Sequence, residues 1–168
     1  MAVVSDAASG LRAASRATIL QLRAPGLSAR KLEDEANLLV SSAAIPVVIS
    51  SRSDIVLAVG AAGVNLPEAD IDVAGARQLL GERLVGRSVH SVEAAQQAER
   101  EGADYVIFGP IWESASHPAS SPVGVEALAE VSRSLHIPVL AIGGVTEERI
   151  AECHAAGAAG YAAIGLFE

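Results

Sequence analysis

Two glycine turns near the end of the chain carry the residues best suited to chemistry. The first, Gly143 and Gly144, follows the continuously apolar run Val139–Ile142. The second, at Gly165, follows the apolar run Gly160–Ile164. Because glycine has no Cβ, the backbone N–H groups of such turns can approach a ligand closely. Two turns of this kind at the ends of successive strands of a (β/α)8 barrel usually hold a phosphate, and a phosphate site is what these residues predict.

Apolar runs recur along the chain, with alanine-rich segments between them. Eight runs in 168 residues put one unit at about every 21 residues, and alternating strands and helices indicate a parallel sheet. Eight strands indicate a closed (β/α)8 TIM barrel, and we expect a single domain over residues 1–168. The expected strands are Ala2–Ser5, Thr18–Leu22, Ile45–Ile49, Gly63–Leu66, Leu84–Val89, Tyr105–Phe108, Val139–Ile142 and Gly160–Ile164. The expected helices are Ala7–Ala17, Ala29–Ser41, Asp54–Ala61, Val73–Leu80, Val92–Glu101, Val125–Ser134 and Glu147–Ala156.

The barrel is expected to be small and to lack its last helix. Barrels of this kind usually have about 250 residues, and about 200 is near the lower limit, whereas this sequence has 168. It stops at Glu168, directly after the eighth predicted strand. Because the first and eighth helices are neighbours in a barrel, an apolar groove is expected between them. A partner subunit would cover such a groove, so we expect a homo-oligomer.

Composition limits the classes of partner. The net charge of −8, from 12 basic and 20 acidic residues, argues against binding to nucleic acid or to an anionic membrane surface. A phosphorylated small molecule stays compatible with this charge, because backbone N–H groups can hold a phosphate. The single cysteine, Cys153, excludes an internal disulfide and a multi-cysteine metal site. The sequence predicts neither a signal peptide nor a membrane span, and the expected location is cytoplasmic.

Several further motifs are spread along nearly the whole chain. They are Gln21–Arg23, Asp54–Ala58, Gly63–Pro67, Gly86–Ser91, Gly102–Val106 and Phe108–Ile111. With the two glycine turns, these motifs resemble the thiamine-phosphate synthase superfamily, which includes a thiazole tautomerase branch, the TenI-like proteins. The resemblance implies a barrel of thiamine biosynthesis that binds a thiazole phosphate at its C-terminal face.

For the synthase branch, the resemblance implies a transferase that joins a pyrimidine diphosphate to the thiazole phosphate. Mg²⁺ and cationic side chains then stabilise the leaving diphosphate. Several positions differ from that pattern: Pro25 replaces a lysine, Ser50-Ser51 replaces an Asn-Asp pair, and His117 aligns with another lysine. Asp70 matches the remaining carboxylate ligand. Mg²⁺ is therefore expected as a cofactor, with Asp70 as its ligand, only if the chain is a synthase.

For the tautomerase branch, the resemblance implies an isomerase that moves a proton to aromatise the thiazole and needs no metal. The motifs Asn65–Pro67 and Gly86–Ser91 are more similar to this branch. Where the branch has its catalytic histidine, however, this chain has Pro110. His90 and His117 are candidates for another base, because both follow C-terminal strand ends and a histidine titrates near working pH.

The main prediction is a TenI-like thiazole phosphate tautomerase that uses no cofactor. The alternatives are a thiamine-phosphate synthase with Mg²⁺ and a catalytically silent barrel that binds a phosphate ligand. Each site residue also has a structural alternative, such as packing for the glycines, a backbone hydrogen bond for Ser88, and a structural hydrogen bond for His90. The predicted catalytic residues are His117 and His90. The predicted substrate-binding residues are Arg23, Ser88, Ser114, Ser116, Gly143, Gly144, Ile164 and Gly165.

Overall fold

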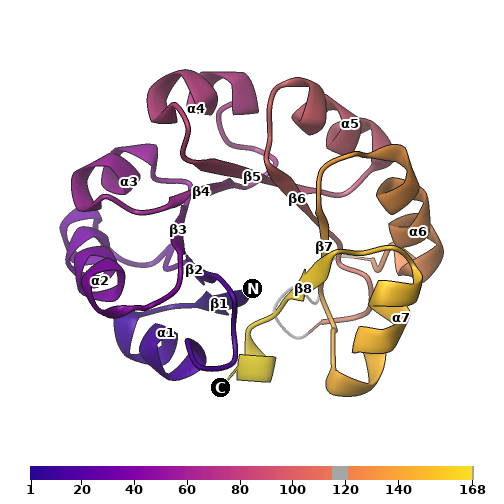
Figure 1. Cartoon of the computed structure of the whole chain (residues 1–168), viewed down its shortest axis with the longest axis horizontal. Helices are drawn as coiled ribbons and strands as arrows, with labels where there is room; N and C mark the ends of the chain where they lie inside the picture. Colours follow the sequence, from indigo (N-terminus) through magenta and orange to yellow (C-terminus); the bar gives the residue numbers. More distant parts are fainter. Residues whose placement is uncertain (115–120, 168) are drawn as a thin grey trace.

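The computed structural model describes residues 1–114 and 121–167. Its strands form one sheet in chain order, and each strand pairs in parallel with the next. Figure 1 shows the strands as a ring with the helices outside it, which confirms the predicted (β/α)8 barrel. The bounds of β4 to β7 agree with the prediction. The strands are β1 (Ala2–Val4), β2 (Leu20–Leu22), β3 (Val47–Ser50), β4 (Gly63–Leu66), β5 (Leu84–Val89), β6 (Tyr105–Phe108), β7 (Val139–Ile142) and β8 (Gly160–Ala162).

The ring closes between β8 and β1 through a short bridge in which Ala2 pairs with Ala163. The Val3 N–H donates to the Ala163 carbonyl at 2.9 Å, and the Ala163 N–H donates to the Met1 carbonyl at 3.2 Å. The Met1 ammonium donates to the Tyr161 carbonyl at 2.7 Å, and burial lowers the pKa of that ammonium to about 6. The ladder at this seam is therefore the shortest in the ring.

The helices alternate with the strands and cover the outside of the ring. Asp6, Ser28, Asp72 and Ser91 cap four of them, because each side chain accepts a hydrogen bond from the N–H three residues later. The helices are α1 (Ala7–Ala13), α2 (Ala29–Ser42), α3 (Ser53–Val59), α4 (Val73–Leu80), α5 (Val92–Arg100), α6 (Gly124–Ser134) and α7 (Ile150–Ala155), with the 3₁₀ turns η1 (Glu147–Arg149) and η2 (Gly165–Phe167).

Two predicted helices are wrong in their extent. The first ends at Ala13 instead of Ala17, because the next residues fold back in a tight turn in which the Ala17 N–H donates to the Ala13 carbonyl. The segment predicted as one helix from Glu147 begins as the 3₁₀ turn η1 and continues as α7. Thr146 precedes this turn, but its side chain makes no capping hydrogen bond to the backbone.

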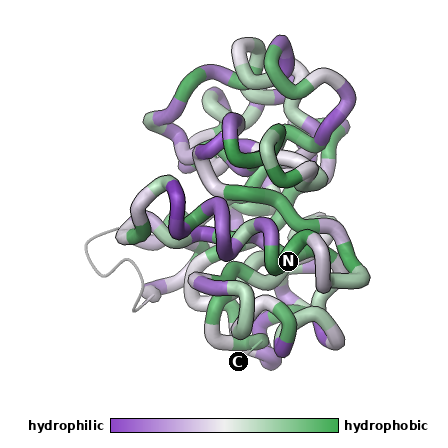
Figure 2. The backbone as a smooth tube through the Cα atoms, turned by 90° about the vertical axis from the view of Figure 1, so that its left-hand side faces the viewer, coloured by the Kyte–Doolittle hydropathy of each residue, from purple (hydrophilic) through white to green (hydrophobic). Residues whose placement is uncertain are grey.

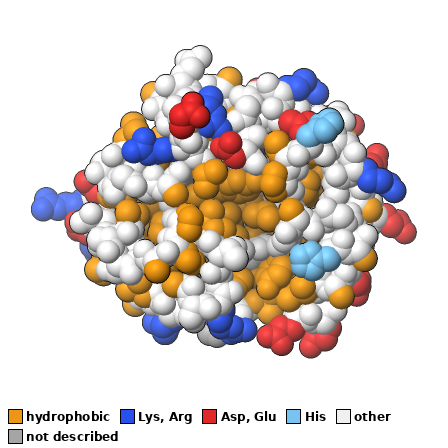
Figure 3. Space-filling view, viewed as in Figure 1, with side chains coloured by type: hydrophobic (Ala, Val, Ile, Leu, Met, Phe, Trp, Pro, Cys, Tyr) orange, Lys and Arg blue, Asp and Glu red, His pale blue; other side chains and the backbone are white. Residues whose placement is uncertain are grey.

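The core has two parts, one inside the ring and one between the ring and the helices. In Figure 2, apolar segments alternate with hydrophilic segments along the chain. In Figure 3, apolar side chains gather at the centre of the face, over the strands, and charged side chains lie around its rim. A Cβ at Gly86 would lie 2.0 Å from Cζ of Tyr105, so this glycine makes room for the tyrosine inside the ring. The buried residues of the inner cluster are Met1, Val3, Val48, Tyr105, Ile107 and Ala162.

After β8, the described chain forms only η2, and no eighth α-helix occurs in it. Figure 1 places η2 between α1 and α7. Phe167 of this turn is 7% exposed, and its ring stacks on Tyr161 with centroids 6.1 Å apart. The groove expected beside α1 is thus partly filled by Phe167. None of the described helices is long and apolar enough to cross a membrane.

Candidate functional site

The carboxyl ends of β7 and β8 frame a cavity of about 590 Å³, here called the glycine-turn pocket. The turn after β7, the turn after β8 and the beginning of the loop after β6 contribute to it. The structure thus brings five of the predicted substrate-binding residues together: Ser114, Gly143, Gly144, Ile164 and Gly165. The full lining is Glu113, Ser114, Ile142, Gly143, Gly144, Val145, Thr146, Arg149, Ala162, Ala163, Ile164, Gly165 and Leu166.

Three successive carbonyls of the first glycine turn are held on one side. Those of Ile142 and Gly143 accept backbone hydrogen bonds of 2.8 and 3.1 Å from the loop after β6. The Gly144 carbonyl accepts a bond of 2.7 Å from the Arg149 side chain. Across a trans peptide, the C=O and the N–H that follows point in opposite directions. The N–H groups of Gly143, Gly144 and Val145 therefore point away from these partners.

Five backbone N–H groups at the pocket donate no hydrogen bond to another residue of the described chain. They belong to Gly143, Gly144, Val145, Ile164 and Gly165. Backbone N–H groups in folded proteins normally have a partner, so these five are candidates to donate to a bound ligand. Successive backbone N–H groups without an internal acceptor can form an anion-binding concavity. The arrangement can therefore hold a phosphate through the backbone alone.

The first glycine turn also needs its glycines for packing. Gly143 and Gly144 have φ values of +90° and +66°, which side chains with a Cβ rarely adopt. A Cβ at Gly143 would lie 2.5 Å from Cβ of Pro110, and one at Gly144 would lie 2.6 Å from the carbonyl oxygen of Glu113. The packing role and the ligand role of these glycines are thus compatible, because they use opposite sides of the turn.

A second cavity of about 300 Å³, here called the arginine pocket, lies at the carboxyl ends of β2, β3 and β4. The exposed Arg23 lines it together with Arg52. Two hydrogen bonds of 2.8 and 2.6 Å join the Arg52 guanidinium to Asp54 and lower the pKa of that carboxyl. Ser51 has a φ of +67°, an uncommon value for serine. The full lining is Arg23, Ala24, Pro25, Leu27, Leu32, Ser50, Ser51, Arg52 and Pro67.

The residues around the arginine pocket do not fit a magnesium ion. Mg²⁺ is usually held by carboxylates together with substrate phosphates. Ser51 stands where the resemblance would place a second carboxylate, and the next residue is the cation Arg52. Asp70 accepts a 2.8 Å hydrogen bond from the N–H of Ile71. In the part of the chain that the structure describes, no group of three His, Cys, Asp or Glu side chains could hold a metal.

Two buried amides that the sequence analysis did not assign to the site lie inside the ring. Asn65 is 1% exposed and Gln21 is 3% exposed. The Asn65 amide donates to Oγ of Ser88 at 3.0 Å, so the partner of Ser88 is a side chain and not the backbone. The Oδ1 of Asn65 and the Oε1 of Gln21 have no partner in the described chain. A polar amide inside an apolar strand was the sequence signal that could have identified both.

His90 lies at the end of β5, and its imidazole bridges two elements. Its Nδ1 contacts the Gly109 carbonyl, and its Nε2 lies 3.8 Å from the Glu68 carboxylate. A carbonyl only accepts hydrogen bonds, so Nδ1 carries a proton and neutral His90 keeps its lone pair on Nε2. His90 does not line the glycine-turn pocket. The other predicted base, His117, and the predicted ligand contact Ser116 lie outside the described residues.

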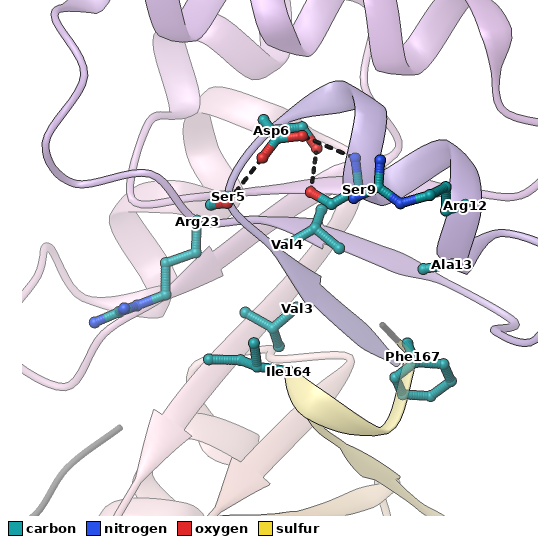
Figure 4. A pocket seen from close by; sticks show the side chains of 10 residues that line it. All are labelled: Val3, Val4, Ser5, Asp6, Ser9, Arg12, Ala13, Arg23, Ile164 and Phe167. Carbon is teal, nitrogen blue, oxygen red and sulfur yellow. Dashed lines mark hydrogen bonds between the residues drawn. The ribbon is translucent and has the colours of Figure 1, made fainter. Parts of the chain in front are cut away.

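A third cavity of about 220 Å³, here called the β1 pocket, lies between the other two. It shares Ile164 with the glycine-turn pocket and Arg23 with the arginine pocket. Figure 4 shows Ile164 and Phe167 facing Val3 across this cavity. Asp6 lies on its far side and accepts hydrogen bonds from Ser5 and Ser9. The three cavities thus follow one another along the mouth of the barrel.

The fold and these cavities define the class of protein. It is a (β/α)8 barrel with ligand-sized cavities at the carboxyl ends of its strands, the end at which barrels of this fold carry their active sites. The Pyrococcus furiosus structure titled thiamine phosphate pyrophosphorylase superimposes with a TM-score of 0.87 and 28% sequence identity, covering 97% of this chain and 84% of that one.

Sequence comparison gives the family. The TMP-TENI family model, described as thiamine monophosphate synthase, matches residues 2–167. The putative thiamine-phosphate synthase 2 of Aquifex aeolicus is 41% identical over 152 residues, which span 89% of this chain and 82% of the relative. The thiamine-phosphate synthase of Chloroflexus aurantiacus is 38% identical over 152 residues, spanning 88% and 70%. The chain therefore belongs to the thiamine monophosphate synthase family.

Proposed function

We propose that this chain is a thiamine-phosphate synthase that binds the phosphate of a thiazole phosphate in the glycine-turn pocket. The observation that carries the proposal is the set of five N–H groups at that pocket without a partner in the described chain. The names of the relatives support the synthase reaction, so it takes precedence over the tautomerase reaction that we predicted first. The reaction joins the thiazole phosphate to a pyrimidine diphosphate.

The arginine pocket suits the second substrate. In the reaction, the thiazole nitrogen forms a bond to the methylene carbon of the pyrimidine, and the C–O bond to the diphosphate breaks. The leaving diphosphate takes the electron pair of that bond. Arg23 and Arg52 line this cavity, and fixed cations placed where negative charge develops stabilise such a step. The β1 pocket links the two cavities through Ile164 and Arg23, so both substrates would lie along one mouth.

A second candidate is the metal-independent tautomerase, and the geometry of His90 favours it. The hydrogen bond from Nδ1 to the Gly109 carbonyl fixes the ring and leaves Nε2 as a base. Glu68, 3.8 Å from Nε2, would stabilise the imidazolium after His90 takes a proton from one position of the thiazole, and the imidazolium would then return a proton to another position. This reaction uses no pyrimidine substrate.

One set of reactions separates the two candidates. The purified chain is mixed with thiazole phosphate carboxylate alone, or with the pyrimidine diphosphate as well, each with and without Mg²⁺. NMR follows the thiazole tautomers, and chromatography follows thiamine phosphate and diphosphate. The synthase proposal predicts thiamine phosphate, diphosphate and the carbon dioxide lost from the carboxylate in equal amounts, and a loss of this activity in Arg23→Gln.

The tautomerase candidate predicts tautomer conversion without the pyrimidine, and a rate roughly 10²- to 10⁴-fold lower in His90→Gln. Binding of the thiazole phosphate with neither product would refute both reactions and leave a phosphate-binding barrel. Absence of any binding would refute the assignment of the glycine-turn pocket itself.

A further inference from the structure

Arg149 is the residue of the site that neither the family motifs nor the sequence analysis singled out. It ends η1 and lines two cavities, the glycine-turn pocket and a neighbouring cavity of about 420 Å³ beside Trp112. We infer that Arg149 controls the affinity of the glycine-turn pocket for phosphate, by orienting one peptide of the turn and by placing a cation at the rim. This inference rests on the proposed function, because it takes the ligand to be a phosphate ester.

The first role is to position the peptide between Gly144 and Val145. Nη1 of Arg149 donates to the Gly144 carbonyl at 2.7 Å. Because the peptide is trans, this hydrogen bond aims the Val145 N–H away from the guanidinium and toward the open side of the turn. The root of the arginine is fixed as well, since its backbone N–H donates to the Thr146 carbonyl at 3.0 Å. A phosphate would meet the Val145 N–H in an orientation set before it binds.

Trp112 holds the guanidinium in place. Cζ of Arg149 lies 4.8 Å from the centroid of the indole ring, which is the geometry of a cation–π contact. Trp112 is itself anchored to the turn, because its backbone N–H donates to the Gly143 carbonyl at 3.1 Å. A guanidinium stacked on a ring keeps its N–H groups in its own plane, where they can donate to a phosphate. The stack therefore orients the donor groups.

The second role is electrostatic. Among the described residues that line the glycine-turn pocket, Arg149 is the one cation and Glu113 is the one carboxylate. Glu147 and Glu148 stand in the same 3₁₀ turn and are exposed. Arg16 pairs with Glu147 at 3.4 Å, but without Arg149 no cation would remain among the described residues that line the pocket. The arginine therefore supplies a positive charge that partly offsets the carboxylates at the rim.

The test compares four proteins by calorimetric titration with inorganic phosphate and with thiazole phosphate: wild type, Arg149→Gln, Arg149→Lys and the control Arg133→Gln. Arg133 is an exposed cation in the last turn of α6, so its removal changes the net charge equally and leaves the pocket intact. We expect Arg149→Gln to weaken binding roughly 10- to 100-fold, the usual effect of losing a hydrogen bond to a charged group. Arg149→Lys should lie between this variant and the wild type, because it keeps the charge and loses the planar fork.

Two further measurements separate this role from a merely structural one. Trp112 is the only tryptophan of the chain, so its fluorescence should shift when ligand binds to the wild type and shift less in Arg149→Gln. The decrease of phosphate affinity with added salt should also be shallower in Arg149→Gln, because one ionic contact is missing. Urea unfolding of each variant checks that the fold persists. If Arg149→Gln does not fold, the comparison of Arg149→Lys with the wild type tests the inference.

Equal phosphate affinity and equal salt dependence in the wild type and in the folded Arg149 variants would overturn the inference and leave the proposed function standing. A wild-type chain that binds neither inorganic phosphate nor thiazole phosphate would overturn both.

Discussion

Replacing Gly144 by alanine probes the two sides of the glycine turn at once. Gly144 has a φ of +66°, and a Cβ in this left-handed region costs about 1–2 kcal/mol. The added Cβ would lie 2.6 Å from the carbonyl oxygen of Glu113 and 2.7 Å from Cβ of Trp112. Overpacking against atoms of this kind costs about 1–3 kcal/mol. We therefore expect Gly144→Ala to lower the free energy of unfolding by about 2–5 kcal/mol.

Gly60 provides a matched control. It has nearly the same backbone angle, +69°, and nothing lies within 4 Å of a Cβ built on it. Gly60→Ala should therefore show only the conformational cost, partly offset because alanine restricts the unfolded chain, with a net loss of about 1 kcal/mol. The difference between the two variants measures the packing of the turn against the loop after β6.

The assay combines urea unfolding with titration by thiazole phosphate. A Cβ at Gly144 forces the turn away from Trp112 and displaces its N–H groups, so we expect the affinity to fall roughly 10- to 100-fold. Gly60→Ala should bind as the wild type does. If Gly144→Ala were as stable as Gly60→Ala and bound thiazole phosphate normally, the account of the turn would be refuted.

Three further predictions concern the surroundings of the site. Asp6→Ala should lower the free energy of unfolding at pH 7 by about 1 kcal/mol, the usual value of an N-cap, as measured by urea titration. Because hydrogen bonds from Ser9 lower the pKa of Asp6, this contribution is present above the pKa of the unfolded carboxyl and should disappear as the pH falls through the lower folded value. Asp6→Asn should keep most of the cap and remove this pH dependence. Phe167→Ala should lower the free energy of unfolding by about 3 kcal/mol in the same assay, the lower end of the range for phenylalanine, because Phe167 covers the seam beside Tyr161. An unchanged midpoint of urea unfolding would show that η2 does not stabilise the ring. Tyr105→Phe should leave the free energy of unfolding unchanged or raise it slightly, because the buried hydroxyl has no partner in the described chain and its removal relieves a desolvation cost. A decrease of more than about 1 kcal/mol, measured by thermal unfolding, would contradict this reasoning.

The ring of strands and the position of the glycine turn could be predicted from the sequence. Alternating apolar strands and alanine-rich helices are local patterns, and β4 to β7 have the predicted bounds. Gly143 and Gly144 could be placed in the site because a strand of four apolar residues precedes them and a polar segment follows. These inferences need only the order of residues along the chain.

Contacts between residues far apart along the chain could not be predicted from the sequence. Nothing in the residues around Arg149 indicates that its guanidinium reaches both Gly144 and the ring of Trp112, since the loop after β6 is brought there by the barrel. The seam shows the same limit, because Phe167 could be assigned to it only once the ring had closed. The tautomer of His90 depends likewise on the Gly109 carbonyl, which comes from the next strand.

The most direct test of the phosphate site is an NMR titration of the ¹⁵N-labelled chain with thiazole phosphate. The account predicts that the amide signals of Gly143, Gly144, Val145, Ile164 and Gly165 shift together and saturate at one affinity, because these N–H groups line the pocket without a partner in the described chain. The amide of Gly60, which ends α3, should stay unchanged. Saturable shifts confined to other residues, with these five signals unmoved, would contradict the placement of the phosphate on the glycine turns.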